Sequence, residues 1–219
     1  TRWWWVRHAP VTVNAGRIYG QIDHPADCSE HDKFRWLAHE LPDTAQLYTS
    51  HLQRTLQTAA GIVTQGGGKN WEKGAEKPDF AEQNFGDWQG KTHDEISSWP
   101  DASGRNFWVS PALMRPPNGE SFADVVARVA PTIHSVCTEF SGKNIVCAAH
   151  YGTIMAALAV ALGGNMKHAM QFRIENLSIT RIDCLEVSNN FGPARRQWCV
   201  HWVNRTAPDI VLPNAPDER

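Results

Sequence analysis

An arginine and a histidine stand side by side after an aromatic, β-branched segment near the start of the chain. Residues 3–6 have the sequence Trp-Trp-Trp-Val, which predicts a buried strand, and Arg7 and His8 follow it. Pro10 lacks an N–H group, so the strand is predicted to end before it. Open α/β sheets bind ligands at the carboxyl ends of their strands. Arg7 and His8 are therefore candidates for a binding or catalytic site.

A second histidine and a second arginine occupy comparable positions. The continuous apolar run of residues 144–149 predicts a central parallel strand, and it ends at His150, directly before a predicted helix. A helix N-terminus has unpaired N–H groups and a partial positive charge, so the backbone at Gly152 is a candidate contact for an anion. Arg54 lies in the first turn of another predicted helix, where the helix dipole disfavours a cation. An anion between them would remove that conflict.

Two guanidinium and two imidazole groups in one pocket would repel one another without a negatively charged ligand. The set Arg7, His8, Arg54 and His150 therefore favours a doubly negative ligand. A phosphoryl group fits best, because the planar fork of arginine pairs with its oxygens.

The elements that must position these residues alternate between strand and helix. The chain has 219 residues, 42% of them hydrophobic, which is enough for one core. The alternation predicts an α/β fold, a three-layer α/β/α sandwich with a mostly parallel central sheet. Residues 174–183 and 196–203 are predicted to add antiparallel strands at one edge. We expect a single domain over residues 1–205, a small cap around residues 92–118, and a C-terminal tail over residues 206–219.

Several local predictions concern the surroundings of the candidate site. Ser50 is predicted to cap a helix over residues 52–65. A short strand is predicted over residues 78–82. Ser121 and Asp124 resemble a capping box at the start of a further helix. The buried face of the helix over residues 52–65 is predicted to contain Leu52, Leu56, Ala59, Ala60 and Val63.

Composition argues against several other classes of protein. The net charge of −2 predicts no nucleic-acid surface, and no apolar run approaches the length of a membrane span. The start of the sequence has no signal-peptide pattern, so we expect a cytoplasmic protein. Five widely spaced cysteines predict reduced thiols, and Cys199 with His201 lacks the partners of a metal site. We expect no metal and no cofactor.

Six motifs occur in order between about residues 3 and 163. They are Arg7-His8, Asn14 with Gly20, Ser50-x-x-x-Arg54-x-x-x-Thr58-Ala59, Glu82-x-x-Phe85-Gly86-x-Trp88-x-Gly90, Gly119-Glu120-Ser121, and Ala149-His150. This ordered set resembles the histidine phosphatase superfamily, also called the phosphoglycerate mutase-like superfamily.

The resemblance implies a role for each matching residue. His8 would be the nucleophile and would form a phosphohistidine. Arg7, Arg54 and His150 would hold the phosphoryl oxygens, with Asn14 assisting. The arginines would also lower the pKa of His8 and keep its attacking nitrogen unprotonated.

Glu82 would protonate the leaving oxygen and then activate water. Each role has a plainer alternative: Arg54 as an exposed helix arginine, Glu82 as a solvated loop carboxylate and Asn14 as a turn residue. Gly20 is expected to serve the geometry of the loop backbone within the substrate-binding region.

Two departures from the family pattern lie next to the histidines. Ala9 stands where the family usually has glycine after Arg-His, and its small side chain is tolerable there. Tyr151 stands where a glycine usually follows the second histidine. Its bulk would narrow the substrate pocket, or its hydroxyl would add a substrate contact.

The family contains both mutases and phosphatases. Mutases resemble one another in carrying a tyrosine and a lysine where this chain has Phe85 and His93, and an arginine pair in the cap, where the arginines here (Arg105 and Arg115) are single. We therefore expect a metal-independent phosphomonoesterase for a small-molecule phosphate ester. The motif Phe85-Gly86-x-Trp88 resembles the α-ribazole-5′-phosphate phosphatase branch. The alternatives are a cofactor-dependent phosphoglycerate mutase-type phosphotransferase and a non-catalytic phosphate-binding adaptor. The oligomeric state stays open.

Overall fold

The central sheet places the two strands that precede the histidines next to each other. The computed structural model describes residues 1–66, 69–99, 112–189 and 192–208. One sheet has the strand order β3-β2-β4-β1-β5-β6, in which β1 to β4 run parallel and the last two strands are antiparallel. The strands are β1 (Arg2–Arg7), β2 (Thr44–Thr49), β3 (Asn70–Lys73), β4 (Asn144–Ala149), β5 (Ile179–Asn189) and β6 (Gly192–Arg205).

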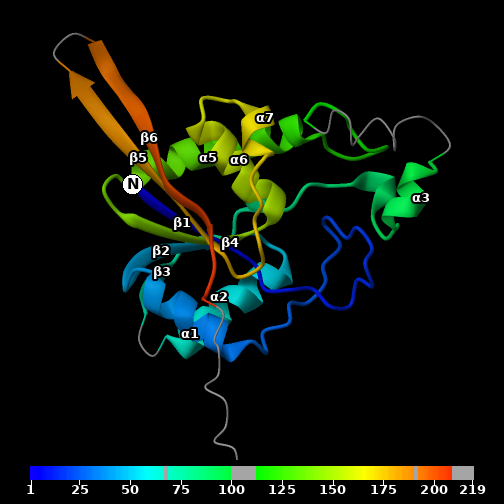
Figure 1. Cartoon of the computed structure of the whole chain (residues 1–219). Helices are drawn as coiled ribbons and strands as arrows, with labels where there is room; N and C mark the ends of the chain where they lie inside the picture. Colours follow the sequence, from blue (N-terminus) through cyan, green and yellow to red (C-terminus); the bar gives the residue numbers. More distant parts are fainter. Residues whose placement is uncertain (67–68, 100–111, 190–191, 209–219) are drawn as a thin grey trace, which may run out of the picture.

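Helices cover both faces of this sheet (Figure 1), so the predicted three-layer α/β/α architecture is confirmed. On one face lie α1 (His31–Glu40) and α2 (Gln53–Gln65). On the other lie α5 (Phe122–Glu139), α6 (Tyr151–Ala161) and α7 (Met166–Ala169). Three short helical segments precede α5: η1 (Pro78–Phe80), η2 (Gly86–Trp88) and α3 (His93–Ser97).

The alternation of side chains along β1 explains how both faces are packed. Trp3 and Trp5 stack with ring centroids 4.7 Å apart in the core beneath α5 and α6. Val6 points to the opposite face and belongs to the cluster that contains Phe34 and Ile62 of α1 and α2. A strand buried on both faces is expected to be apolar throughout, as the residues of β1 before Arg7 largely are.

The predicted strand over residues 78–82 is wrong. Pro78 begins the turn η1, and the carbonyl groups of Phe80 and Ala81 accept hydrogen bonds from the Thr153 hydroxyl rather than from a neighbouring strand. The edge strand is instead β3, which pairs in parallel with β2. Its sequence is mostly polar and exposed, so it lacks the apolar pattern by which strands are identified.

Two predictions for the region of α2 are also wrong. Ser50 is not its N-cap residue, because α2 begins at Gln53 and Leu52 precedes it without a capping side chain. The expected inward positions Ala60 and Val63 are exposed. The residues of α2 that are buried are Arg54, Thr55, Thr58, Ala59 and Ile62, so polar side chains occupy most of the inner face.

The cap is described only in part. Thr92 and Glu95 form a capping box at α3, and the predicted capping box of Ser121 and Asp124 is present at α5. Residues 100–111, which include Arg105, lie outside the described residues, as do residues 209–219 of the expected tail. The division into a domain, a cap and a tail stays a prediction.

Candidate active site

The register of the central strands brings the two histidines together. Arg7 is paired with Ala149 across β1 and β4, and the His8 N–H donates to the Ala149 carbonyl at 2.9 Å. The next residue after Ala149 is His150. The imidazole centroids of His8 and His150 lie 5.2 Å apart, and both side chains are fully buried.

His8 has one occupied and one unoccupied ring nitrogen. Its Nδ1 lies 2.7 Å from the carbonyl oxygen of Ala9. Because a carbonyl oxygen only accepts, Nδ1 carries the proton and Nε2 has a lone pair. No described residue forms a hydrogen bond with Nε2. Burial above all, and then the charges of Arg54 and Arg7, hold the pKa of His8 well below its ordinary value of 6.5. The imidazole is therefore neutral, with the lone pair that a nucleophile requires.

His150, Arg54 and Ser50 form a buried chain of hydrogen bonds. Arg54 Nε donates to His150 Nδ1 at 3.2 Å, so His150 Nε2 carries the proton and donates to Ser50 Oγ at 2.7 Å. Burial above all lowers the pKa of His150 well below 6.5, and neighbouring positive charges lower it further. Both nitrogens of His150 are thus engaged, and the ring orients the guanidinium of Arg54.

The guanidinium of Arg54 is fully buried, and its two Nη atoms also form hydrogen bonds. Its Nη1 and Nη2 donate to the carbonyl groups of Ile22 and Gly20 at 2.9 and 2.6 Å. Both carbonyls belong to the long loop over residues 11–27. This loop and α2 therefore fix one cation beside His8.

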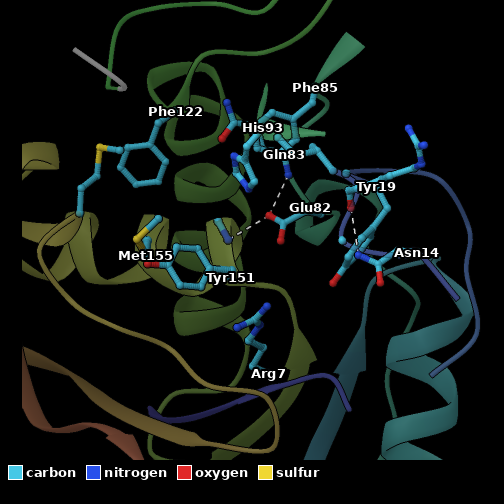
Figure 2. Close-up of a pocket in the computed structure, with 16 residues that line it drawn as sticks. Arg7, Asn14, Tyr19, Glu82, Gln83, Phe85, His93, Phe122, Tyr151 and Met155 are labelled. Carbon is cyan, nitrogen blue, oxygen red and sulfur yellow. Dashed lines mark hydrogen bonds between the residues drawn. The ribbon is translucent and has the colours of Figure 1, made fainter. Parts of the chain in front are cut away.

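Glu82 reaches the site from the segment after η1. Its Oε1 accepts hydrogen bonds from the backbone N–H groups of Gly152 and Gln83, each at 2.9 Å (Figure 2). The sequence predicts that the N–H of Gly152 contacts the phosphate. In the structure this N–H donates to the Glu82 carboxylate instead. A carboxylate is a favoured partner for a helix N-terminus such as that of α6.

Arg7 and Tyr151 lie together at the edge of the site. Arg7 Nη1 donates to the Ile174 carbonyl at 2.6 Å, and the guanidinium carbon lies 5.2 Å from the centroid of the Tyr151 ring. Arg7 Nε is buried and has no hydrogen-bond partner among the described residues. The Tyr151 hydroxyl donates to the Phe172 carbonyl at 3.2 Å, so the ring rather than the hydroxyl faces the substrate region.

Asn14 and Gly20 belong to the loop over residues 11–27. Asn14 Nδ2 donates to the Arg17 carbonyl at 2.9 Å within this loop. Gly20 has a φ angle of +45°, and a β-carbon there would lie 2.9 Å from the Gln83 carbonyl oxygen. Only glycine therefore allows the loop to approach the Glu82 segment this closely.

A cavity of about 470 Å³ lies beside Arg7, Glu82 and Tyr151 (Figure 2). Arg7, Asn14, Glu82 and Gly152 line it, and much of the remaining wall is apolar. The apolar wall includes Ile18, Phe85, Phe122, Met155 and Met170.

Tyr19 contacts both this cavity and the buried His8. Its ring centroid lies 6.4 Å from that of His8 and 5.1 Å from the guanidinium carbon of Arg54. His8 and Arg54 are both completely inaccessible to solvent, whereas Tyr19 lines the cavity. Tyr19 is therefore one of the side chains that lie between His8 and the solvent-accessible space of the cavity.

The sequence profile of the histidine phosphatase superfamily (branch 1) matches residues 3–191 of the chain. The chain belongs to this superfamily. A glucosyl-3-phosphoglycerate phosphatase of Mycolicibacterium vanbaalenii is 30% identical to this histidine phosphatase over 168 residues, 72% of each chain. A 2,3-bisphosphoglycerate-dependent phosphoglycerate mutase of Bartonella henselae is 34% identical over 118 residues, 53% of this chain and 57% of the mutase.

Solved structures of phosphatases share the fold. The native mycobacterial glucosyl-3-phosphoglycerate phosphatase superimposes with a TM-score of 0.75 at 25% identity, over 94% of this chain and 99% of its own. The α-ribazole phosphatase of Shigella flexneri has a TM-score of 0.74 at 20% identity, over 95% of this chain and 100% of its own, which shows the fold alone. The expectation of a phosphoric monoester hydrolase of the histidine phosphatase type is confirmed by the family and by the 30% identical glucosyl-3-phosphoglycerate phosphatase.

The sequence did not identify two residues at the site of this histidine phosphatase. Ser50 completes the chain from Arg54 through His150, and Tyr19 covers His8. Ser50 precedes a helix and looks like an ordinary cap, and Tyr19 lies in a loop without periodicity, so only the three-dimensional structure reveals either role.

Arg115, the cap arginine that lies within the described residues, does not line the cavity. Arg115 pairs with Asp124 at 2.7 Å. Within the described ranges, no cluster of three or more His, Cys, Asp or Glu residues could hold a metal ion. No helix in the same ranges is long and apolar enough to cross a membrane.

Proposed function

We propose that this histidine phosphatase is a metal-independent phosphomonoesterase that hydrolyses a small phosphate ester through a phosphohistidine on His8. The observation that carries the proposal is the unoccupied lone pair of His8 Nε2, buried beside the fixed guanidinium of Arg54. A neutral imidazole held among cations is matched to a doubly negative phosphoryl group.

The proposed reaction has two displacements. His8 Nε2 attacks phosphorus, and the bond from phosphorus to the ester oxygen breaks as Glu82 gives its proton to that oxygen. Glu82 then takes a proton from water, and the resulting hydroxide attacks the phosphohistidine. Inorganic phosphate leaves, and His8 and Glu82 return to their starting protonation states. Arg7 and Arg54 neutralise the phosphoryl oxygens in both steps, with His150 holding the guanidinium of Arg54.

The lining of the cavity supports hydrolysis rather than mutase activity. A mutase has to hold a second anionic group of a bisphosphate. Among the described residues that line the cavity, the lysine and arginine residues are Arg7 and Arg17, and Arg17 is already paired with Glu95 at 3.2 Å. The apolar side of the cavity instead favours an uncharged leaving alcohol.

The substrate that we propose is a small phosphorylated metabolite with an uncharged, partly apolar leaving group. The α-ribazole 5′-phosphate of the branch that the motifs resemble has this character. Glucosyl-3-phosphoglycerate, after which the mycobacterial relatives are named, carries a carboxylate. It therefore serves as the charged substrate for comparison.

The test is hydrolysis of p-nitrophenyl phosphate in the presence of EDTA, with a radiolabelled phosphate ester used to trap the covalent enzyme. We expect activity and an acid-labile, alkali-stable phosphoenzyme in the wild type, and neither in His8→Ala. His39→Ala, which alters an exposed histidine of α1, is the matched control and should behave as the wild type. Activity that survives His8→Ala would overturn the mechanism.

The relatives that are named mutases make phosphotransfer the second candidate. Incubation with 3-phosphoglycerate and a 2,3-bisphosphoglycerate primer distinguishes the two activities. Faster isomerisation than phosphate release would favour the mutase. Phosphate binding without turnover of any ester would favour a non-catalytic adaptor.

A further inference from the structure

The backbone that carries Glu82 has little regular secondary structure to hold it. Residues 81–84 lie between η1 and η2, outside every strand of the sheet. Glu82 itself is 8% exposed, so its position is set by contacts with protein groups rather than by water. Among the described residues, Arg128 on α5 donates the largest number of side-chain hydrogen bonds to the carbonyl groups of residues 79–82.

Arg128 donates to one carbonyl group of η1 and to two carbonyl groups of this segment. Its Nη1 donates to the Asp79 carbonyl at 2.5 Å, and its Nη2 donates to the carbonyls of Ala81 and Glu82 at 3.0 and 2.9 Å. The guanidinium also pairs with both carboxylate oxygens of Glu120, at 2.8 and 3.1 Å. One planar group therefore ties α5 to the backbone of the proton donor.

Glu120 extends the same attachment beyond Glu82. Its Oε2 accepts from the Asn84 N–H at 2.9 Å, and its carbonyl accepts from the Gln83 side chain at 2.6 Å. The backbone is thus held before, at and after Glu82. Arginine is the side chain that can supply this many donors in a fixed plane.

We propose that Arg128, paired with Glu120, is a positioning residue that places the Glu82 carboxyl group for proton transfer to the leaving oxygen. The inference rests on the proposed function, because it gives Glu82 the role of general acid. Arg128 does not line the cavity and acts through Glu82 rather than on the substrate.

The dependence on the leaving group tests this role. Departure of an alkoxide from β-glycerophosphate requires a proton, whereas p-nitrophenolate is stable without one. The constant kcat/KM reports only steps up to the first irreversible one, so it isolates formation of the phosphohistidine. For Arg128→Gln we expect kcat/KM to fall about 10²-fold for β-glycerophosphate and to stay nearly unchanged for p-nitrophenyl phosphate.

Arg181→Gln is the matched control. Arg181 forms a similar two-oxygen pair with Asp183, and its side chain has the same 20% exposure as that of Arg128, but it lies on β5 against Trp4. This variant removes a comparable ion pair without touching the Glu82 segment. It should lower both kcat/KM values equally or leave both unchanged.

A double-mutant cycle makes the test independent of folding. In a Glu82→Gln background, Arg128→Gln should have no further effect on β-glycerophosphate hydrolysis, because the group that it positions is already lost. Glu120→Gln provides a second, milder variant, with the same expected selectivity for the alkyl ester. Thermal unfolding identifies any variant that has lost its fold.

Each outcome bears on one of the two proposals. Equal losses with both substrates, or a full additional loss in the Glu82→Gln background, would overturn the positioning role while leaving the phosphatase proposal intact. If the wild type hydrolyses neither ester, the proposed function itself fails.

Discussion

Substituting Gly152 by alanine should separate catalysis from stability. Gly152 lies in the first turn of α6 and donates its N–H to Glu82 Oε1 at 2.9 Å. A β-carbon at this position would lie 2.5 Å from the same oxygen, a distance that real β-carbon contacts essentially never show. The added methyl group therefore has to push the Glu82 carboxylate away from the N–H that holds it.

The expected loss follows from that displaced hydrogen bond. A hydrogen bond to a charged group contributes about 1.5–3 kcal/mol, which corresponds to a fall of about 10- to 150-fold in kcat/KM if it is lost from the transition state. The free energy of unfolding should fall by less than this, because alanine is about 0.5–1 kcal/mol more favourable than glycine inside a helix and offsets part of the lost bond. Gly152→Ala is thus expected to be less active while it remains folded.

Two measurements on the same preparation decide the matter. Kinetics with β-glycerophosphate give the loss in kcat/KM, p-nitrophenyl phosphate is the internal control that needs no proton donor, and urea denaturation gives the free energy of unfolding. Full activity toward β-glycerophosphate in a stably folded Gly152→Ala protein would refute the assignment of Glu82 as proton donor. Equal losses with both substrates would place the damage at the phosphoryl site instead.

Two further predictions concern the buried histidines. Tyr19→Ala should uncover His8 and accelerate its modification by diethyl pyrocarbonate, measured by mass spectrometry, and an unchanged rate would show that Tyr19 does not shield it. Burial lowers the pKa values of His8 and His150 below 6.5, so the unfolded chain binds more protons than the native one below that pH. The free energy of unfolding should therefore be highest above pH 6.5. As the pH falls below 6.5, it should decrease by up to about 1.4 kcal/mol per pH unit for each histidine. Urea denaturation across this range measures the slope, which His8→Asn should reduce.

The parts of the site that lie at strand ends could be predicted from the sequence. β1 and β4 are both apolar runs that stop at a histidine, and the carboxyl ends of neighbouring parallel strands meet at one edge of a sheet. The structure places His8 and His150 together by this rule. The antiparallel pair β5 and β6 was predictable from alternation, but not its bounds. β5 begins at Ile179 instead of residue 174 and continues to Asn189, and β6 extends beyond the predicted strand at both ends.

The inner face of α2 could not be predicted from hydrophobic periodicity. That face buries Arg54, Thr55 and Thr58, because they hold loop carbonyls, Ser50 and the Ala9 N–H. A search for apolar periodicity assigns such polar residues to the exposed face, and it therefore places Ala60 on the buried face. The buried polar residues beside His8 and His150 are therefore the ones that hydrophobic periodicity misplaces.

The position of Glu82 was unpredictable for a different reason. Its segment looks like a short strand, but it is held by a side chain 46 residues later in the chain, Arg128, and by Thr153 on α6. Such contacts depend on how α5 and α6 pack against the sheet, which local sequence does not encode. The resemblance to the family placed Glu82 at the site where local reasoning could not.

His8 and Glu82, the proposed nucleophile and proton donor, are consequently held by different kinds of interaction. His8 follows a central strand whose hydrogen bonds to β4 fix its backbone, whereas Glu82 depends on side-chain contacts from Arg128 and on the N–H of Gly152. Substitutions around Glu82 can therefore change proton transfer without disturbing the sheet. Substitutions that move His8 have to disturb the core, because the strand ends that carry it are buried. Under the proposed mechanism, changes around Glu82 would therefore alter the step that depends on the leaving group and leave the groups that hold the phosphoryl oxygens unchanged.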